Sequence, residues 1–480
     1  MWRLEPSAGP RPADLDRFVQ IVNEHASFWE PHTPISVARA PGRLDLMGGI
    51  ADYSGSLVLQ LPLDVATLAA VQPVAEPTIT VLSTTAAELG GAPQVTLPLR
   101  TLLPIDQPLS YAAARKLLSS SEQSWAGYIL GALVVLRRER GLQLDQGLRI
   151  LIRSSVPPGK GVSSSAALEV ATMQALSGAL GHALDGRDLA LLCQLVEHQI
   201  VGAPCGVMDQ MTSACGEQGR LLALRCQPAE LEPPVALPDA IEVWGIDSGI
   251  RHAVSGADYG SVRSGAFMGY RIIAEAAGLP VAQVGAGRVT IADERWGGYL
   301  ANVTPSEWES HFRALTPEML DGATFLARYG GFTDSATTID PERIYAVRQP
   351  TAHPIYEHDR VRRFRELLQQ PCGEDQLRQL GELMYQSHAS YSACGLGAVG
   401  TDRLVELVRA AGPAQGLYGA KITGGGSGGT VAVLARRGSR PAVERIAEQY
   451  ARETGQPPAT LLGGSSPGAT EIGALRLRAD

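Results

Sequence analysis

The feature of this sequence that most limits its fold is a glycine- and serine-rich segment, residues 156–167, between a predicted strand and a predicted helix. Alternating apolar residues predict the strand over 147–153, and a run of small residues predicts the helix over 165–180. Gly159 and Gly161 let a ligand approach the main chain, and three serines place hydroxyls at the helix start. Because amides at a helix N-terminus attract anions, the segment is suited to holding phosphate. It lacks the Walker A spacing, and a serine-capped helix after a glycine turn is the alternative.

A second glycine-rich segment spans residues 422–430. Gly424, Gly426 and Gly429 satisfy the G-x-G-x-x-G pattern of dinucleotide-binding proteins, but that pattern must open a helix. The residues that follow, 430–434, continue as a strand, so the dinucleotide interpretation does not fit. The segment is typical of a loop packed closely against a ligand or another loop, with a structural hairpin as the alternative.

Two further segments carry charged residues in unusual surroundings. Arg43, Asp45 and Asp52 lie in a turn-rich stretch, where an isolated charge is more often a solvated or capping group. Glu197 lies late in an amphipathic helix, and Asp209 follows a Pro-Cys-Gly turn among apolar residues. A carboxylate in apolar surroundings needs a partner. Two carboxylates and serine hydroxyls are the groups that a site for Mg²⁺ and a nucleotide requires.

The chain of 480 residues is long enough for two domains, and its 45% apolar residues can form sizeable cores. Prolines cluster between residues 228 and 238, so we predict an N-terminal domain over 15–235 and a C-terminal domain over 236–480. The remaining patterns predict a mixed α+β fold. Further helices are expected at 15–30, 124–140, 187–201, 260–277, 359–368 and 402–411, and further strands at 241–246, 417–422 and 430–434.

Composition excludes several classes of protein. Acidic residues outnumber basic ones by 49 to 41, and the net charge of −8 argues against a protein whose main task is to bind nucleic acid. No apolar run reaches the roughly 18 residues of a membrane span. The six cysteines form no metal-ligand pattern, and the polar N-terminus shows no signal peptide. We therefore expect a cytoplasmic protein with reduced thiols, whose partners are small molecules and whose oligomeric state the sequence does not determine.

Lysine is rare in this chain. Only Lys116, Lys160 and Lys421 are present among 41 basic residues, as codon usage in a GC-rich genome would produce. Two of the three lie in or beside the glycine-rich segments, and an ammonium group is a compact charge suited to phosphate. We therefore expect Lys160 and Lys421 to line a phosphate site, with a Lys421 that points away as the alternative.

The four segments, in this order, resemble the motifs of the GHMP small-molecule kinases, and residues 42–55 resemble the galactokinase signature. Residues 245–259 are similar to the matching galactokinase region, and the similarity extends from about residue 35 to the C-terminus. The resemblance implies an α+β, two-lobed GHMP kinase fold. Its N-terminal lobe would be ribosomal-protein-S5-domain-2-like, its C-terminal lobe ferredoxin-like, and its active site would lie in the cleft between them.

The resemblance also implies roles for individual residues, with ATP and Mg²⁺ as the cofactors. The residues expected to hold the ATP phosphates are Pro158, Gly159, Lys160, Gly161, Val162, Ser163, Ser164, Ser165 and Ala166. The glycine loop expected in the same cleft consists of Gly424, Gly425, Gly426, Ser427 and Gly428. The expected metal ligands are Ser165 and Glu197. The residues expected to contact a sugar are Arg43, Gly49, Ile50, Asp52, Gly206, Asp209 and Tyr259.

Arg43 and Asp209 are the residues implied as catalytic. Arg43 would lie between Asp209 and the γ-phosphate, where it stabilises phosphoryl charge and orients the carboxylate. An aspartate beside an arginine is held in its ionised form, which makes it a weak general base. We therefore expect Asp209 mainly to orient the sugar hydroxyl and to accept its proton late in the transfer.

Residues 48–60 depart from galactokinases and resemble the kinase portion of plant L-arabinokinases. Galactokinases carry Glu-His where this chain has Gly49-Ile50, and that pair lies toward the exocyclic CH2OH of the sugar. L-Arabinopyranose has the galacto ring configuration without that group, and a pocket without polar partners binds an extra hydroxyl poorly. The resemblance thus implies a kinase that makes L-arabinose 1-phosphate. A galactokinase with an altered substrate loop and a non-catalytic sugar sensor on the same fold are the alternatives.

Overall fold

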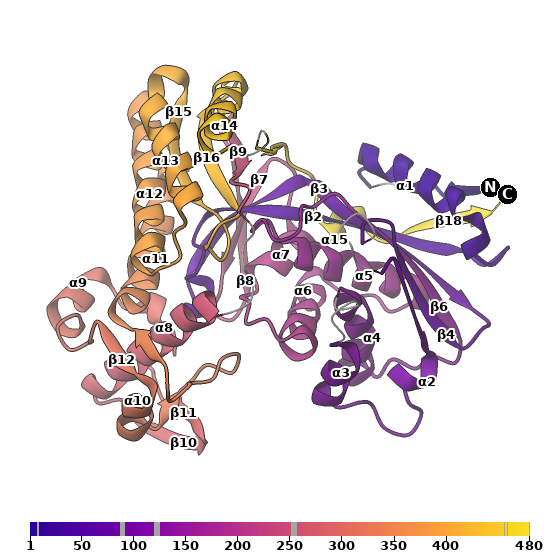
Figure 1. Cartoon of the computed structure of the whole chain (residues 1–480), viewed down its shortest axis with the longest axis horizontal. Helices are drawn as coiled ribbons and strands as arrows, with labels where there is room; N and C mark the ends of the chain where they lie inside the picture. Colours follow the sequence, from indigo (N-terminus) through magenta and orange to yellow (C-terminus); the bar gives the residue numbers. More distant parts are fainter. Residues whose placement is uncertain are drawn as a thin grey trace.

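The computed structural model describes residues 1–6, 9–86, 92–119, 125–250, 257–455, 457 and 459–479. These residues form an N-terminal part with a large sheet, a C-terminal part with a smaller sheet, and a third part that lies below the second in Figure 1. The α+β composition predicted from the sequence is therefore present, whereas the third part was not predicted.

The N-terminal part is built on a nine-stranded sheet with the order β1-β18-β2-β3-β6-β4-β5, to which β7 and β8 are joined through β3. Its strands are β1 Trp2–Leu4, β2 Ile35–Met47, β3 Leu57–Val74, β4 Thr78–Ser83, β5 Gln94–Pro98, β6 Gly147–Ser154, β7 Arg220–Arg225, β8 Glu230–Ala236 and β18 Leu475–Ala479. The long strands β2 and β3 pair antiparallel along most of their length. Both are buried almost throughout, since other elements pack on the sheet.

Helices α4 to α7 cover one face of this sheet, below it in Figure 1. The helices of the N-terminal part are α1 Ala13–Glu24, α2 Leu99–Leu102, α3 Tyr111–Leu118, α4 Ala126–Arg140, α5 Ser164–Leu180, α6 Gly186–Leu195, α7 Met208–Cys215 and α15 Ala469–Ile472. Helix α5 packs against β2 and β3, and more than half of its residues are buried. Its N-terminus therefore lies close to Arg43 in β2, which places the predicted phosphate segment next to a buried cation.

The C-terminal part has a four-stranded sheet with the order β15-β16-β9-β17. Its elements are β9 Ile241–Asp247, α11 Arg348–Leu368, α12 Glu374–Ala393, α13 Val399–Ala411, β15 Leu417–Ile422, β16 Thr430–Arg436, α14 Arg440–Thr454 and β17 Leu461–Leu462. The third part comprises α8 Ala257–Ala276, β10 Val281–Gly285, β11 Gly287–Ile291, α9 Pro305–Glu307, β12 Met319–Asp321, α10 Gly322–Tyr329, β13 Gly331–Phe332 and β14 Ile344–Ala346. Its two apolar clusters are centred on the aromatic side chains of Trp308 and Phe325.

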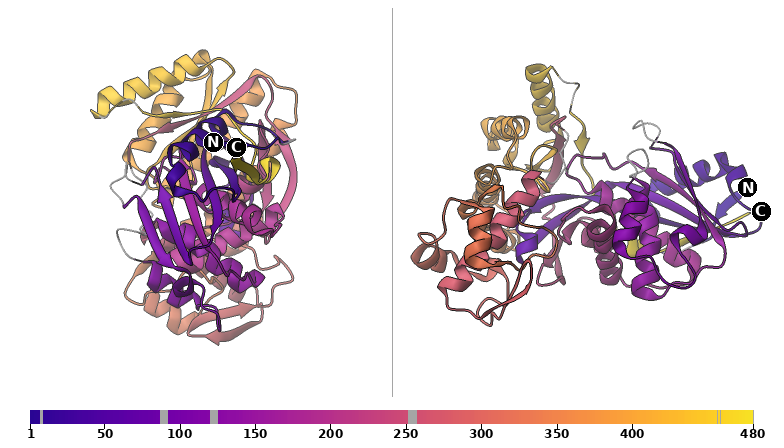
Figure 2. Two further views of the ribbon diagram at one scale, coloured as in Figure 1. Left: turned by 90° about the vertical axis from the view of Figure 1, so that its right-hand side faces the viewer. Right: turned by 60° about the horizontal axis from the view of Figure 1, so that its bottom comes forward.

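The chain returns to its first sheet at its end. Strand β18 pairs antiparallel with both β1 and β2, so residues from both ends of the sequence share one sheet. The two ends of the described chain accordingly lie side by side, as both views of Figure 2 show. The division at 235/236 stays a prediction, and a C-terminal domain defined as 236–480 would include this strand of the N-terminal sheet.

Most elements predicted from the sequence are present, with changed ends. The helix predicted over 15–30 stops at Glu24 and is followed by a separate 3₁₀ turn, Ala26–Phe28. The helix predicted over 359–368 begins earlier, at Arg348, with Pro350 in its first turn and Pro354 inside it. The helix predicted over 187–201 ends in a π-helical turn, Val196–Val201, which carries Glu197.

In the described ranges we find no helix with the length and apolar character needed to cross a lipid bilayer. The expectation of a cytoplasmic protein stays a prediction.

Candidate active site

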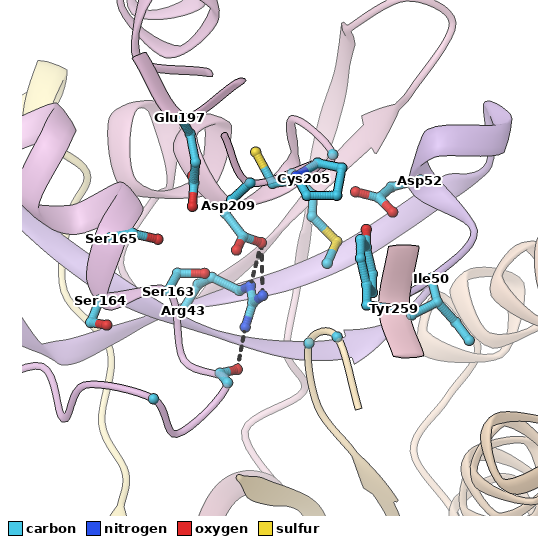
Figure 3. A pocket seen from close by; sticks show the side chains of 18 residues that line it. Arg43, Ile50, Asp52, Ser163, Ser164, Ser165, Glu197, Cys205, Asp209 and Tyr259 are labelled. Carbon is cyan, nitrogen blue, oxygen red and sulfur yellow. Dashed lines mark hydrogen bonds and ion pairs between the residues drawn. The ribbon is translucent and has the colours of Figure 1, made fainter. Parts of the chain in front are cut away.

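One pocket brings the four sequence segments together (Figure 3). It lies where β2, the start of α5, the start of α7, α8 and the loop between β15 and β16 meet. The residues that line it are Arg43, Ile50, Asp52, Gly159, Gly161, Ser163, Ser164, Ser165, Glu197, Ala203, Pro204, Cys205, Gly206, Met208, Asp209, Tyr259, Gly424 and Gly425.

The Arg43 guanidinium lies at the centre of this pocket and joins three segments. Its Nε and Nη2 atoms donate to Oδ1 of Asp209 at 3.0 and 2.7 Å, and Nη1 donates to the Gly161 carbonyl at 2.7 Å. Burial lowers the pKa of Arg43, but the charges of Asp209 and Asp45 outweigh this effect and raise the pKa above its ordinary value. Both bonds to Asp209 use Oδ1, so Oδ2 is left to face the pocket.

The predicted phosphate segment forms the side of the pocket next to helix α5. Gly159 and Gly161 adopt positive φ angles of 68°, and Ser163 adopts a left-handed conformation at the helix start. Ser164 and Ser165 occupy the first turn of α5, so its free amides face the pocket. The alternative of a serine-capped helix is wrong, because no side chain forms a capping hydrogen bond at the start of α5.

Four predicted members of this segment do not line the pocket. Pro158 is exposed, whereas Val162 and Ala166 are buried. Lys160 Nζ lies 3.1 Å from Asp247 Oδ1. A phosphate role for these four residues stays a prediction.

Glu197 is a buried carboxylate next to the serines. Burial, followed by the charge of Asp209, raises its pKa to about 7, although hydrogen bonds from Ser165, Cys205 and Gln210 oppose the change. Gln210 Nε2 donates to Glu197 Oε2 at 2.6 Å and also to Glu169 Oε2 at 3.2 Å. Burial and the charge of Glu197 raise the pKa of Glu169 well above its ordinary value.

The oxygens of Glu197 and Ser165 are hard donors of the kind that Mg²⁺ prefers. Among the described residues, no three His, Cys, Asp or Glu side chains form a metal-binding cluster. A site with one carboxylate and one hydroxyl fits Mg²⁺, because this ion usually keeps water ligands and shares phosphate oxygens. The residues therefore fit the predicted ion when phosphate supplies the remaining ligands.

Asp52 lies on the opposite side of Arg43 from the serines, together with Tyr259 (Figure 3). Its side chain is 3% exposed, and both carboxylate oxygens lack a hydrogen-bond partner. Burial, followed by the charge of Asp209, raises the pKa of Asp52 to about 7. A buried carboxylate without partners is costly, so the arrangement suits a ligand that brings hydroxyl donors.

Gly206 and Gly49 leave space for polar groups beside the pocket. A Cβ atom on Gly206 would lie 1.5 Å from Asp52 Oδ2, and one on Gly49 would lie 1.8 Å from the Tyr391 hydroxyl oxygen. Neither backbone can therefore carry a side chain without a shift of its neighbours. Ile50, with a positive φ of 50°, lines the far end of the pocket and packs against Tyr391.

The predicted glycine loop contributes Gly424 and Gly425 to the pocket. A Cβ atom on Gly424 would lie 2.8 Å from the Gly161 carbonyl oxygen and 3.2 Å from Arg43 Nη2, so the two glycine-rich segments pack directly on each other. The other three predicted members, Gly426, Ser427 and Gly428, lie outside the lining, and Gly426 and Gly428 pack against Leu396 and Ile250. The loop joins two paired strands and is therefore a hairpin, as the alternative had it. It also packs on another loop, as predicted.

The expectation that Lys421 faces phosphate is wrong. Its side chain is completely buried, and Nζ lies 2.7 Å from Oδ2 of Asp45, which is also completely buried. The side chain thus reaches from β15 to Asp45 in β2 and is not part of the pocket lining, and the pair satisfies the buried ammonium group.

Arg263 is a site residue that the sequence did not reveal. It lies one helical turn after Tyr259 on α8 and forms a two-pronged ion pair with Asp334 at 2.7 and 2.9 Å. Its Nη1 atom donates to the carbonyls of Pro204 and Cys205, immediately before Gly206. Only the helical spacing from Tyr259 could have indicated it, because Asp334 is 71 residues away.

Three family models match the chain. The galactokinase galactose-binding signature matches residues 23–73, the GHMP kinases N terminal domain matches 127–217, and the GHMP kinases C terminal model matches 364–455. Each matched range contributes residues to the pocket, including Arg43, Asp209 and Gly424.

Relatives of known name are similar to most of the chain. An L-arabinokinase of Arabidopsis thaliana is 45% identical over 493 aligned residues, which cover 94% of this chain and 47% of the plant protein. This chain thus spans about half the length of that relative. A galactokinase of Chloroflexus aurantiacus is 31% identical over 431 residues, which cover 88% of this chain and 90% of that protein.

Solved structures share the fold. Lactococcus lactis galactokinase complexed with galactose has a TM-score of 0.69 at 20% identity and covers 95% of this chain and 100% of its own. Methanococcus jannaschii mevalonate kinase has a TM-score of 0.53 at 14% identity, with 89% and 98% covered. The GHMP kinase fold predicted from the sequence is confirmed.

Gly206→Ala tests the close approach to Asp52. A methyl group 1.5 Å from a buried carboxylate oxygen forces one of the two to move, so we expect a loss of about 1–3 kcal/mol in the free energy of unfolding. Gly260→Ala is the matched control, since its added Cβ would meet nothing within 4 Å. Thermal unfolding of the two variants measures the difference, and equal midpoints would contradict the described packing.

Asp52→Asn tests the raised pKa. The folded chain binds a proton at Asp52 up to a pH of about 7, while the unfolded chain releases it near 3.8, so this carboxylate lowers stability increasingly as the pH rises between those values. We expect the unfolding midpoint of Asp52→Asn, relative to the parent, to rise from pH 5 to pH 8. Between pH 5 and pH 8 this change in stability amounts to about 3 kcal/mol at most. A pH-independent difference between Asp52→Asn and the parent would refute the assignment.

Proposed function

Because the chain belongs to the GHMP kinase family, we propose that it is a sugar kinase that converts ATP and L-arabinose to ADP and L-arabinose 1-phosphate. The observation that carries the proposal is the position of the Arg43–Asp209 pair. On one side of it lie helix amides and serine hydroxyls, and on the other lies an unpartnered buried carboxylate (Figure 3). A phosphate donor and a polyhydroxyl acceptor can thus meet at Asp209.

The phosphate side consists of the start of α5. Main-chain amides after Gly161 and the hydroxyls of Ser163–Ser165 bind the phosphates of ATP. Ser165 and Glu197 would hold Mg²⁺, which neutralises charge on the β- and γ-phosphates when bound. Glu197 must give up its proton to do so, since burial has raised its pKa to about 7.

The sugar side consists of Asp52, Gly206 and Tyr259. Each oxygen of Asp52 accepts a hydrogen bond from a ring hydroxyl, which supplies the partners that this carboxylate lacks. Arg263 holds the preceding loop through the Pro204 and Cys205 carbonyls, so Gly206 stays against Asp52.

The transfer takes place at Asp209. Oδ2 of Asp209 orients the anomeric hydroxyl of the sugar. The bond from the anomeric oxygen to the γ-phosphorus forms as the bond from this phosphorus to the β–γ bridging oxygen breaks. The hydroxyl proton passes to Asp209 late in the step, while Arg43 holds the other oxygen of this carboxylate in place. Arg43 stabilises the charge on the transferred group from the same position.

The preference for L-arabinose rests on Gly49 and Ile50, together with the 45% identity to the plant enzyme. The space that a side chain at position 49 would need is filled by the Tyr391 hydroxyl and the Asp45 carboxylate. Positions 49 and 50 themselves therefore offer no carboxylate or imidazole to a sugar CH2OH group. D-Galactose is the second candidate substrate, supported by the galactose-binding signature and the Chloroflexus relative.

A coupled ADP-release assay with both sugars decides between these substrates. We expect kcat/KM to be at least about tenfold higher for L-arabinose, the effect of one poorly satisfied buried hydroxyl. A higher kcat/KM for D-galactose would overturn the assignment of the pentose and leave the sugar kinase in place. Absence of sugar-dependent ADP release would overturn both.

Asp209→Asn tests the transfer step. The amide keeps the shape of the side chain but cannot accept the hydroxyl proton, so kcat should fall by at least about 100-fold. Binding of ATP, measured by calorimetry, should stay near normal because the start of α5 is untouched. Asp106→Asn, on the exposed surface, controls for the charge change. Unchanged turnover in Asp209→Asn would refute its role.

A further inference from the structure

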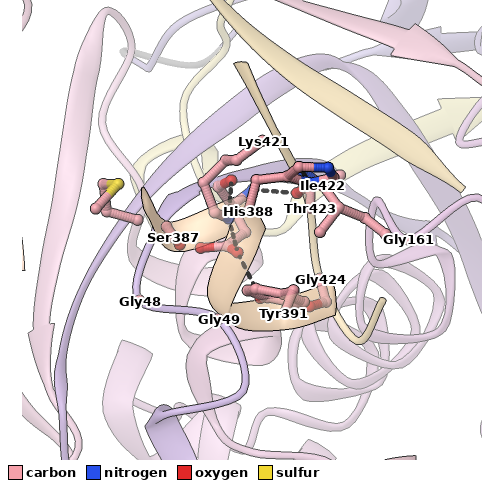
Figure 4. A network of polar contacts seen from close by, with 12 residues as sticks. Gly48, Gly49, Gly161, Ser387, His388, Tyr391, Lys421, Ile422, Thr423 and Gly424 are labelled. Atoms are coloured by element: carbon pink, nitrogen blue, oxygen red, sulfur yellow. Dashed lines mark hydrogen bonds and ion pairs between the residues drawn. The ribbon is translucent and has the colours of Figure 1, made fainter. Parts of the chain in front are cut away.

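A buried polar cluster lies behind the pocket, between β2, α11, α12 and β15 (Figure 4). Its members are Asp45, His353, Tyr391 and Lys421, and each is at most 1% exposed. We call this group the Tyr391 cluster. The proposed transfer step uses none of these residues, although they come from both the N-terminal and the C-terminal part of the fold.

The Tyr391 hydroxyl is placed between the two loops that form the pocket. It donates to the Gly424 carbonyl at 2.8 Å and lies 3.3 Å from Oδ2 of Asp45. A phenol has one proton, so the shorter bond to Gly424 is the main one. Lys421, 2.7 Å from the same Asp45 oxygen, satisfies that carboxylate independently.

The sugar loop, residues 48–52, passes directly over this hydroxyl. A Cβ atom on Gly49 would lie 1.8 Å from the Tyr391 oxygen and 2.3 Å from Asp45 Oδ2, so the bare main chain rests on both groups. His353 fixes the loop from the other side, with Nε2 3.0 Å from the Gly49 carbonyl and Nδ1 2.8 Å from the Ser390 hydroxyl. The carbonyl can only accept, so Nε2 carries the proton and donates to it.

The hydrogen bond from the Tyr391 hydroxyl to the Gly424 carbonyl also holds the glycine loop. Gly424 lines the pocket, and its main chain packs on Gly161 and on the Arg43 guanidinium. The ring of Tyr391 also limits this loop, because a Cβ atom on Gly426 would lie 3.3 Å from ring carbon Cδ1. One hydroxyl group therefore touches the loop expected to contact the sugar and bonds the loop that packs on the proposed phosphate site.

We propose that Tyr391 is a positioning residue for phosphoryl transfer, whose hydroxyl holds the glycine loop in register with the sugar loop. This inference rests on the proposed function, because it assigns a catalytic consequence to the bond. The bond fixes the Gly424 main chain against Arg43, while the space left by Gly49 lets the sugar loop settle on the same oxygen. A change at the hydroxyl should thus disturb the alignment of the two substrates.

Tyr391→Phe separates the bond from the packing. The phenylalanine ring keeps the contacts with Ile50, Leu396 and Ile422, while the Gly424 carbonyl loses its donor. We expect kcat to fall about tenfold, the equilibrium equivalent of one buried hydrogen bond. Tyr385→Phe is the matched control, because Tyr385 lies on the same helix and packs on Arg409 away from the pocket.

Hydrogen exchange provides a readout that needs no substrate. Tyr391→Phe should speed amide exchange in peptides that cover residues 417–430, whereas Tyr385→Phe should leave it unchanged. Both a lower kcat and faster exchange in this loop are expected. A residue with only a structural role would lower the unfolding midpoint with kcat unchanged, and unchanged kcat or unchanged exchange would overturn the proposal.

Gly49→Ala tests the contact with the sugar loop in a double-mutant cycle. The added methyl group would collide with the Tyr391 oxygen, so it should destabilise the parent more than it destabilises Tyr391→Phe. Additive changes in the unfolding midpoint would overturn the proposed contact. If the parent phosphorylates neither sugar, the proposed function fails, and exchange and this cycle still decide whether the two loops are coupled.

Discussion

The pocket depends on the burial of one guanidinium group. Arg43 is 2% exposed, and a buried charge is tolerated only when it is paired and hydrogen-bonded. Its partners come from two other segments, the Gly161 carbonyl before α5 and the Asp209 carboxylate at the start of α7. The requirement to satisfy this one group therefore brings a helix N-terminus and an acceptor carboxylate to the same strand.

Close approaches to glycine then define the remaining walls. The Asp52 carboxylate takes the space of a side chain on Gly206, and the Tyr391 hydroxyl takes the space of one on Gly49. In both places a polar group from another segment lies directly on bare main chain. The pocket is thus shaped as much by absent side chains as by those present, which explains why its glycines cluster in short sequence segments.

Much of this arrangement could be predicted from the sequence, because the key signals are local. The turn at 156–163 and the small residues after it predict the start of α5, and the structure begins that helix at Ser164. The direction of the Lys421 side chain could not be predicted, because Lys421 pairs with Asp45, 376 residues away in the sequence. The same holds for Arg263 and Asp334, and for the third part of the fold, whose short strands and aromatic clusters lack a clear period. Local patterns predicted the motifs, while long-range pairing of buried charges decided which side chains face the pocket.

The central claim is that phosphate is transferred to the anomeric oxygen of a pentose held between Asp52 and Asp209. The most direct measurement is a phosphorus NMR spectrum of the product formed from ATP and L-arabinose. The account predicts a sugar phosphate whose phosphorus couples to the anomeric hydrogen, in an amount equal to the ADP released. Coupling to any other ring hydrogen, or release of inorganic phosphate in place of a sugar phosphate, would contradict it.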